Sequence, residues 1–137
     1  MLKVVFDTNV IVSAAFYQAS LPALLLSLAL EEKVRLFVSP ALLNEYERVL
    51  KRPRFKLAEK EIMELMDKIN RKAVIITPTQ RLDVFKEDEP DNRILECAAK
   101  AKADFIITGN TKHFSFEEFR GSKIVTPREF INRISNL

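Results

Sequence analysis

The sequence predicts one α/β domain built on a mostly parallel sheet of four to five strands, with helices covering both faces. Short apolar runs, typical of strands buried on both sides, alternate along the chain with longer helix-like segments. The length of 137 residues suits a single domain, and no linker-like stretch divides it, so we expect one domain over residues 1–137. The apolar share of 47% and the charged share of 30% are typical of a soluble globular chain.

The first third of the chain holds two predicted strands with two helices between them. The run KVVF at residues 3–6 is short, continuous and apolar, which predicts a buried strand. Helices are expected over 10–17 and 21–31, separated near Ser20 to Pro22. The run RLFV at 35–38 predicts the second strand.

The middle of the chain repeats this order. Ser39 and Pro40 predict a helix start, because serine caps an amino terminus and proline suits the first helical position. That helix is expected to end near Leu50, and an amphipathic helix should follow over roughly 59–71. The run AVII at 73–76 predicts the third strand.

The last third begins with the polar, acidic stretch 80–92, which predicts a loop. A helix is expected over about 91–102, followed by a strand at 104–108 with the sequence DFIIT. A short strand is expected at 123–125. Thr126 to Glu129 then form a capping box that opens the last helix.

Bulk properties limit the classes of function. The net charge of +3 permits a nucleic-acid partner without requiring one. Cys97 is the only cysteine, which excludes an internal disulfide, fits a reducing compartment and predicts a small buried side chain. The longest apolar stretch, 21–30, is about half the roughly 20 residues that a membrane crossing needs, and the opening MLKVVFD shows no signal peptide. We therefore expect a cytoplasmic protein without a membrane segment.

Polar residues interrupt the chain where the first predicted strand ends, in the stretch VVFDTNVIV. Asp7 directly follows that strand, and Thr108, Gly109 and Asn110 directly end the fourth one. If the two strands are neighbours, these groups face the same crevice, since ligands of open parallel sheets bind beyond the carboxyl ends of the strands. The alternative for Asp7 is a helix N-cap.

Glu45 lies on the inward-facing side of its predicted helix. At about 100° per residue it falls on the apolar stripe that contains Leu42, Tyr46 and Val49, whereas Arg48 is assigned to the solvated face. A carboxylate on such a stripe is costly unless it is paired, hydrogen-bonded or bound to a metal. The alternative is that Glu45 bends out to water.

Asp91 opens the helix predicted for 91–102 and shares a face with Ile94 and Leu95. Its alternative role is to complement the helix dipole. Three carboxylates converging on one crevice repel one another, and Mg²⁺ or Mn²⁺, which prefer oxygen ligands, would relieve that repulsion. The sequence has no zinc-type His/Cys spacing, no glycine-rich phosphate loop and no Ser-His-Asp set.

Four stretches match a family pattern: VVFDTNVIVSA, SPALLNEYERVL, DNRILECAAKAKADFIITGN and KHF. They resemble the PIN-domain superfamily, and within it the small prokaryotic, VapC-like toxin components of toxin–antitoxin modules. The resemblance covers nearly the whole chain. It implies a three-layer α/β/α sandwich and a metal-dependent ribonuclease that hydrolyses single-stranded RNA.

The resemblance also implies a set of site residues. The three family acids match Asp7, Glu45 and Asp91, which would hold Mg²⁺ or Mn²⁺, and the fourth position is Asn110, a neutral amide where the family often has Asp. Polar positions that surround the metal in the family match Thr8, Asn9 and Thr108.

Basic residues after the Glu45 helix could guide an RNA backbone. They are Lys51, Arg52, Arg54 and Lys56. Their alternative is a solvated helix end. Phe55, between them, could stack on a base or anchor the core. A cognate antitoxin is implied by the resemblance alone, and a homodimer is expected because the Leu-rich segment 21–30 looks apolar around much of its circumference.

Two other functions stay open. A phosphatase of the haloacid dehalogenase type would share the opening VVFDTNV, but the general acid of that family falls on Asn9 here. A non-catalytic PIN domain that holds RNA or a protein partner without cleaving RNA is favoured by Asn110 and by the modest net charge.

Overall fold

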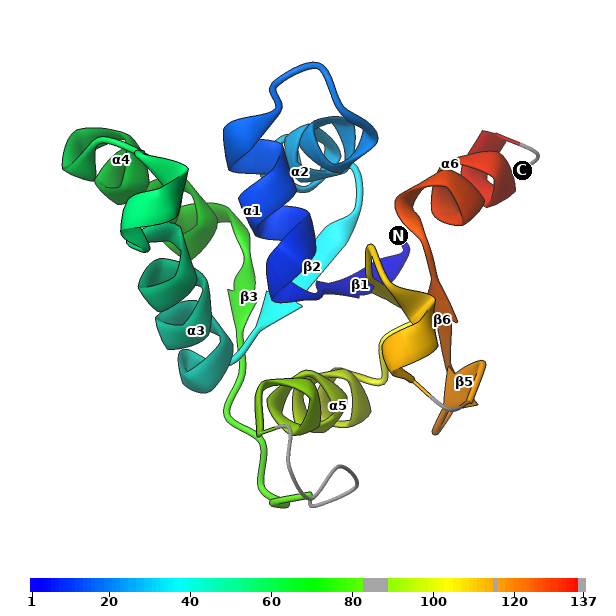
Figure 1. The fold of residues 1–137 in the computed structure, drawn as a ribbon. Coiled ribbons are helices and arrows are strands. Elements are labelled where there is room, and N and C mark those ends of the chain that lie inside the picture. Colours follow the sequence, from blue (N-terminus) through cyan, green and yellow to red (C-terminus); the bar gives the residue numbers. More distant parts are fainter. Residues whose placement is uncertain (83–88, 115, 136–137) are drawn as a thin grey trace.

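The computed structural model describes residues 1–82, 89–114 and 116–135, and it forms the three predicted layers (Figure 1). The six-stranded sheet has the order β3-β2-β1-β4-β6-β5, and only β5 runs antiparallel to its neighbour. Its strands are β1 (Lys3–Phe6), β2 (Arg35–Val38), β3 (Val74–Ile75), β4 (Phe105–Ile107), β5 (Glu118–Phe119) and β6 (Ser122–Val125).

In the described residues, six α-helices and two short 3₁₀ helices accompany the strands. The α-helices are α1 (Thr8–Phe16), α2 (Leu21–Leu30), α3 (Pro40–Leu50), α4 (Glu59–Lys72), α5 (Glu89–Ala101) and α6 (Pro127–Ser135). The 3₁₀ turns are η1 (Pro53–Phe55) and η2 (Thr111–His113). Figure 1 shows α5 on one face of the sheet and α1 with α2 on the other, while α3 packs against both α1 and α5.

The central strands are neighbours, as the crevice prediction requires. β1 lies between β2 and β4, with Phe6 opposite Ile107 at the carboxyl ends of β1 and β4. Val4, Val5 and Phe6 are fully buried, which is why this strand reads as a continuous apolar run. The strand order reverses direction at the β1–β4 pair, the place where open α/β sheets bind ligands.

Most element boundaries follow the predicted signals. The hydroxyl of Ser39 accepts a hydrogen bond from the Leu42 N–H at 3.1 Å, and Thr126 and Glu129 exchange both capping-box bonds at 3.1 and 3.2 Å. Cys97 is fully buried, and burial raises the pKa of its thiol to about 12. No single helix in the described ranges is long and apolar enough to cross a membrane, although α1 and α2, bent by 102°, meet the criterion as a pair.

Two predictions about secondary structure are wrong. The sheet has a sixth strand, because the short β5 pairs with β6 as an antiparallel edge. Helix α5 begins at Glu89 rather than at Asp91, so residues 89–92 are helical and not part of a loop. The rest of the predicted loop overlaps residues 83–88, which lie outside the described residues.

Candidate active site

Three acids from distant parts of the sequence line one open cavity of about 310 Å³. Asp7 follows β1, Glu45 projects from α3, and Asp91 lies in the first turn of α5. Asp7 and Asp91 are each only 6% exposed. The volume is roughly ten times the ~30 Å³ that one water occupies in the liquid, so the cavity has room for a hydrated ion and part of a substrate.

Asp7 occupies the N-cap position of α1 but does not cap the helix with its side chain. Its Oδ2 instead accepts hydrogen bonds from the Thr108 hydroxyl at 2.7 Å and from the Asn9 amide at 3.1 Å. The two polar strand ends are thus joined side chain to side chain across β1 and β4. The structure therefore rejects the capping alternative for Asp7 and orients its carboxylate toward the cavity.

The loop after β4 is tied to the same cluster. The Gly109 N–H donates to Asn9 Oδ1 at 3.0 Å, and a Cβ built on Gly109 would meet that oxygen at 3.2 Å. Glycine allows the loop to approach this closely. The Asn110 N–H donates to the Thr108 hydroxyl at 3.1 Å. Asn9, in the first turn of α1, and Thr108, directly after β4, thereby hold the Asp7 carboxylate from two sides.

Among the residues that the structure describes, Thr8 is the buried cavity residue with a polar side-chain atom that lacks a hydrogen-bond partner. Within the described residues, the Thr8 hydroxyl is buried and makes no hydrogen bond, although Thr8 lines the cavity. A buried hydroxyl without a partner costs about 1–3 kcal/mol. Such groups need an explanation, and a bound water or ion that completes the hydrogen bonding is a common one.

Glu45 is half-buried and faces the cavity, as the helix pattern predicts, but it has a charged partner. Arg48 pairs with both of its carboxylate oxygens, with Nη2 at 2.8 and 2.9 Å and Nε at 3.2 Å. The assignment of Arg48 to the opposite face of the helix is therefore wrong. The Arg48 side chain is 60% exposed, and exposed pairs of this kind contribute only about 0.2–1 kcal/mol. A cation in the cavity could therefore compete with Arg48 for the Glu45 carboxylate at a small cost in free energy.

Tyr46, next to Glu45 on α3, connects that helix to the strand that carries Asp7. It is fully buried, and its hydroxyl donates to the Phe6 carbonyl at 2.5 Å. Burial, with a smaller effect from Cys97 and Asp7, holds the pKa of Tyr46 well above its usual range. Tyr46 therefore stays a neutral donor, and the sequence pattern had identified it only as part of an apolar stripe.

Glu96 is a buried acid with a structural role, and it provides a comparison for Asp7. It is 7% exposed, accepts the Leu82 N–H at 2.6 Å and pairs with Arg93 at 2.9 Å. It thus joins α5 to the segment before the helix. Asp7 differs because it accepts hydrogen bonds from the neutral donors Asn9 and Thr108 beside an open cavity.

The donor set of the cavity fits a hard divalent cation. Carboxylates and a hydroxyl are the oxygen ligands that Mg²⁺ and Mn²⁺ take, and the unpartnered Thr8 hydroxyl lies among them. Across the described ranges, no three Asp, Glu, His or Cys side chains already converge closely enough to form a metal group. Mg²⁺ usually keeps several waters and binds one or two carboxylates directly, so it does not require three converged carboxylates.

The other predicted site residues divide into two groups. Arg52, Arg54 and Phe55 line the cavity together with Thr8 and Asn9. Lys51, whose ammonium lies 3.4 Å from the Glu47 carboxylate, is not part of the lining, and neither is the exposed Lys56. Asn110 also lies outside the lining, because its Oδ1 accepts the Lys112 N–H at 3.2 Å and caps η2.

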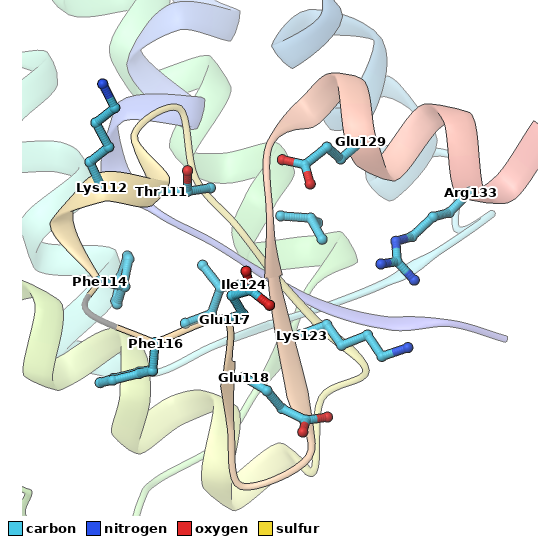
Figure 2. A pocket seen from close by; sticks show the side chains of 11 residues that line it. Thr111, Lys112, Phe114, Phe116, Glu117, Glu118, Lys123, Ile124, Glu129 and Arg133 are labelled. Atoms are coloured by element: carbon cyan, nitrogen blue, oxygen red, sulfur yellow. The ribbon is translucent and has the colours of Figure 1, made fainter.

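A cavity of about 580 Å³ lies elsewhere, between η2, β6 and α6 (Figure 2). Figure 2 shows glutamates and basic residues around the same opening, with Glu129 and Arg133 both contributed by α6. Asp7, Glu45 and Asp91 do not line it. The acids of the larger cavity are Glu117, Glu118 and Glu129, so it does not hold the acids predicted at the carboxyl ends of β1 and β4.

Comparison with known proteins identifies the family. A family model described as the PIN domain matches residues 3–112 of the chain. The chain belongs to the PIN-domain family. A relative from Methanocaldococcus jannaschii, described as an uncharacterized protein, is 32% identical over 141 residues, covering 95% of this chain and 90% of the relative.

The family assignment agrees with the geometry of the site. PIN domains have a nuclease-type fold, are generally nucleases and usually use divalent metal ions. The matched region contains every acid of the cavity, whereas most residues around the larger cavity in Figure 2 lie beyond it. The acid-lined cavity at the β1–β4 ends is thus the candidate active site of this PIN domain.

Proposed function

We propose that this PIN domain is a Mg²⁺- or Mn²⁺-dependent endoribonuclease that hydrolyses phosphodiester bonds of single-stranded RNA. The observation that carries the proposal is the meeting of Asp7, Glu45 and Asp91 in one cavity at the β1–β4 ends. A bound divalent cation supplies charge stabilisation at the phosphate and activates water. The role of the protein is to hold these oxygens in place, with Thr108 and Asn9 orienting Asp7.

The experiment compares Asp7→Asn with the wild-type protein on an unstructured RNA in Mn²⁺. Asparagine keeps the size of the side chain and removes its charge. Because metal-assisted charge stabilisation is worth several kcal/mol, we expect cleavage to fall by roughly 100-fold or more. Asp104→Asn is the matched control, since Asp104 is exposed at the amino end of β4 and accepts the Lys3 N–H. Cleavage by Asp7→Asn at the wild-type rate would exclude the proposal.

A second candidate function is a non-catalytic PIN domain that binds RNA or a partner. The pairing of Glu45 with Arg48 and the capping role of Asn110 favour it, because both occupy side chains that the nuclease would use. Calorimetry with Mn²⁺ separates the two functions. A nuclease centre binds Mn²⁺ with an affinity that Asp91→Ala abolishes, whereas a centre without catalytic function shows no such binding. The PIN-domain assignment removes the support for a haloacid-dehalogenase-type phosphatase.

The biological setting is a further part of the proposal. We propose a cytoplasmic protein that acts as the toxin of a toxin–antitoxin module, on the basis of the sequence resemblance. A homodimer also stays a prediction. Leu25 and Leu26 of α2 are buried within the chain, while Leu24 is 46% exposed and is a large apolar side chain of that helix that a second copy could cover.

A further inference from the structure

Three aromatic residues, of which two are exposed and Phe55 is half-buried, form a cluster beside the acid-lined cavity. Phe16 ends α1 and is 46% exposed, and the adjacent Tyr17 is 61% exposed. Their ring centroids lie 4.9 Å apart in an edge-on arrangement. Phe55 of η1 joins from another part of the chain, with its ring 6.2 Å from that of Phe16. Single exposed apolar residues are ordinary, but three neighbouring rings that are linked through Phe16 form a surface.

The cluster is continuous with the cavity. Phe55 lines the cavity directly, and Phe16 lies one helical turn beyond the cavity residues Val12 and Ser13. Figure 1 shows α1 leading away from the end of β1, so the rings extend the site along this helix. Phe16 and Phe55 are also not part of the hydrophobic core found among the described residues. The structure therefore rejects the alternative that Phe55 anchors the core.

Positive charge accompanies the rings. The Arg54 guanidinium lies over the Phe55 ring at 4.9 Å from its centroid, and Arg52 and Arg54 both line the cavity. Aromatic rings that stack on bases, together with arginines that contact phosphates, are the combination by which proteins bind single-stranded nucleic acid. A duplex does not offer its base faces to such a surface.

We propose that Phe16, Tyr17, Phe55 and Arg54 form a stacking platform for the unpaired bases of a single-stranded nucleic acid whose backbone runs into the acid-lined cavity. The proposal rests on the proposed nuclease function for what happens to the strand in the cavity. Recognition of the strand itself needs no metal. According to this proposal, the three rings, rather than the acids, give the protein its preference for single strands.

The test measures binding of a labelled, unstructured 12-nucleotide RNA by fluorescence anisotropy in EDTA, so that no divalent cation is present. Leucine removes the ring but keeps apolar bulk. We expect Tyr17→Leu/Phe55→Leu to bind about 5- to 150-fold more weakly for each stacked base that is lost. The single variant Tyr17→Leu, at an exposed position, repeats the test where folding is not at risk. The matched control is Phe119→Leu, because the Arg120 guanidinium lies over the Phe119 ring at 5.2 Å and neither residue lines the acid-lined cavity.

Three further arms decide the outcome. An oligonucleotide with abasic sites should bind the wild-type protein as weakly as RNA binds the double variant, and DNA of the same sequence reports whether the sugar matters. A duplex should bind wild type and variant alike. The proposal is overturned if the double variant binds RNA within twofold of wild type, if single strand and duplex are weakened equally, or if light scattering shows that the variants lose a dimer instead. Because binding is measured without metal, the two proposals can fail independently. The cleavage assay with Asp7→Asn tests the nuclease function, and the binding assay tests the stacking platform.

Discussion

The hydrogen bond from Thr108 to Asp7 should be a main determinant of stability at this site. Thr108 is fully buried, and its hydroxyl donates to Asp7 Oδ2 at 2.7 Å while accepting from the Asn110 N–H at 3.1 Å. Thr108→Val keeps the shape and removes both bonds. A bond to a carboxylate is worth about 1.5–3 kcal/mol and a neutral one about 0.5–1.5 kcal/mol, so we expect a loss of about 2–4 kcal/mol.

This loss converts into a measurable change of melting temperature. At ~2.1 cal/mol/K per residue, the unfolding entropy of the 137-residue chain makes 1 kcal/mol equal to roughly 3.5 °C. Thr108→Val should therefore melt about 7–14 °C below wild type in EDTA, followed by circular dichroism. Thr108→Ser, which keeps the hydroxyl and loses one methyl, should cost only about 1 kcal/mol.

The same substitution at exposed Thr77 is the matched control and should change stability by less than about 0.5 kcal/mol. The reasoning is refuted if Thr108→Val melts within about 2 °C of wild type. It is also refuted if Thr108→Ser is as unstable as Thr108→Val, because the lost methyl rather than the hydroxyl would then explain the effect.

Two further predictions concern buried groups. Tyr46→Phe leaves the Phe6 carbonyl without its donor and should cost about 1–3 kcal/mol in urea unfolding, whereas Tyr17→Phe at the surface should cost almost nothing. Burial raises the Cys97 pKa from 9.0 to about 12, so the folded state keeps its proton after the unfolded chain has lost it. That contribution to stability is complete below pH 9 and should fall by about 1.4 kcal/mol by pH 10, a decrease that Cys97→Ala should lack.

Each of these predictions has a clear contradicting result. Equal unfolding free energies for Tyr46→Phe and Tyr17→Phe would show that the hydroxyl of Tyr46 does not stabilise the end of β1. Parallel stability curves for wild type and Cys97→Ala between pH 8 and 10 would show that the thiol ionises as easily in the folded protein as in the unfolded one.

The sequence predicted the layers and the two strands that end at the site because the responsible segments carry strong local signals, whereas the pairing of these strands was only a condition of the prediction. Val4, Val5 and Phe6 are apolar in succession because both faces of β1 are covered. The edge strand β5 has no comparable signal. It is a two-residue segment, Glu118–Phe119, too short for any alternation to be visible, and it pairs only through contact with β6.

The start of α5 was missed for a different reason. Glu89 and Pro90 belong to an acidic stretch that looks like a loop, yet both residue types suit the first turn of a helix. The starting residue of a helix is a balance between such local preferences and tertiary packing. For this reason the sequence predicted correctly that Asp91 faces inward, but it placed the first residue of the helix two positions too late.

The partners of the site residues were harder to predict than the residues themselves. Arg48 was assigned to the far face of α3, but a spacing of three residues places it only about 60° around the helix from Glu45, within reach of its carboxylate. The role of Asn110 depends on the η2 turn that follows it, which periodicity does not reveal. Glu45 was correctly assigned to the inner face because the apolar stripe of α3 is pronounced.

The distribution of buried polar groups separates the functional site from the scaffold. Ser39 caps a helix, Ser122 donates to the Ala103 carbonyl at 2.6 Å, and Glu96 has the Leu82 N–H and Arg93 as partners. Each of these groups stabilises a local structure. Thr8, at the cavity, lowers stability instead, because its hydroxyl is buried without a hydrogen bond among the described residues. In the described residues, the other buried side-chain atom without a hydrogen bond is Arg93 Nε, and it lies 2.9 Å from the Glu96 carboxylate as an ion pair. Local rules are broken where function requires it, so the unpartnered Thr8 hydroxyl points to the cavity at the end of β1 as the place where a ligand completes the structure.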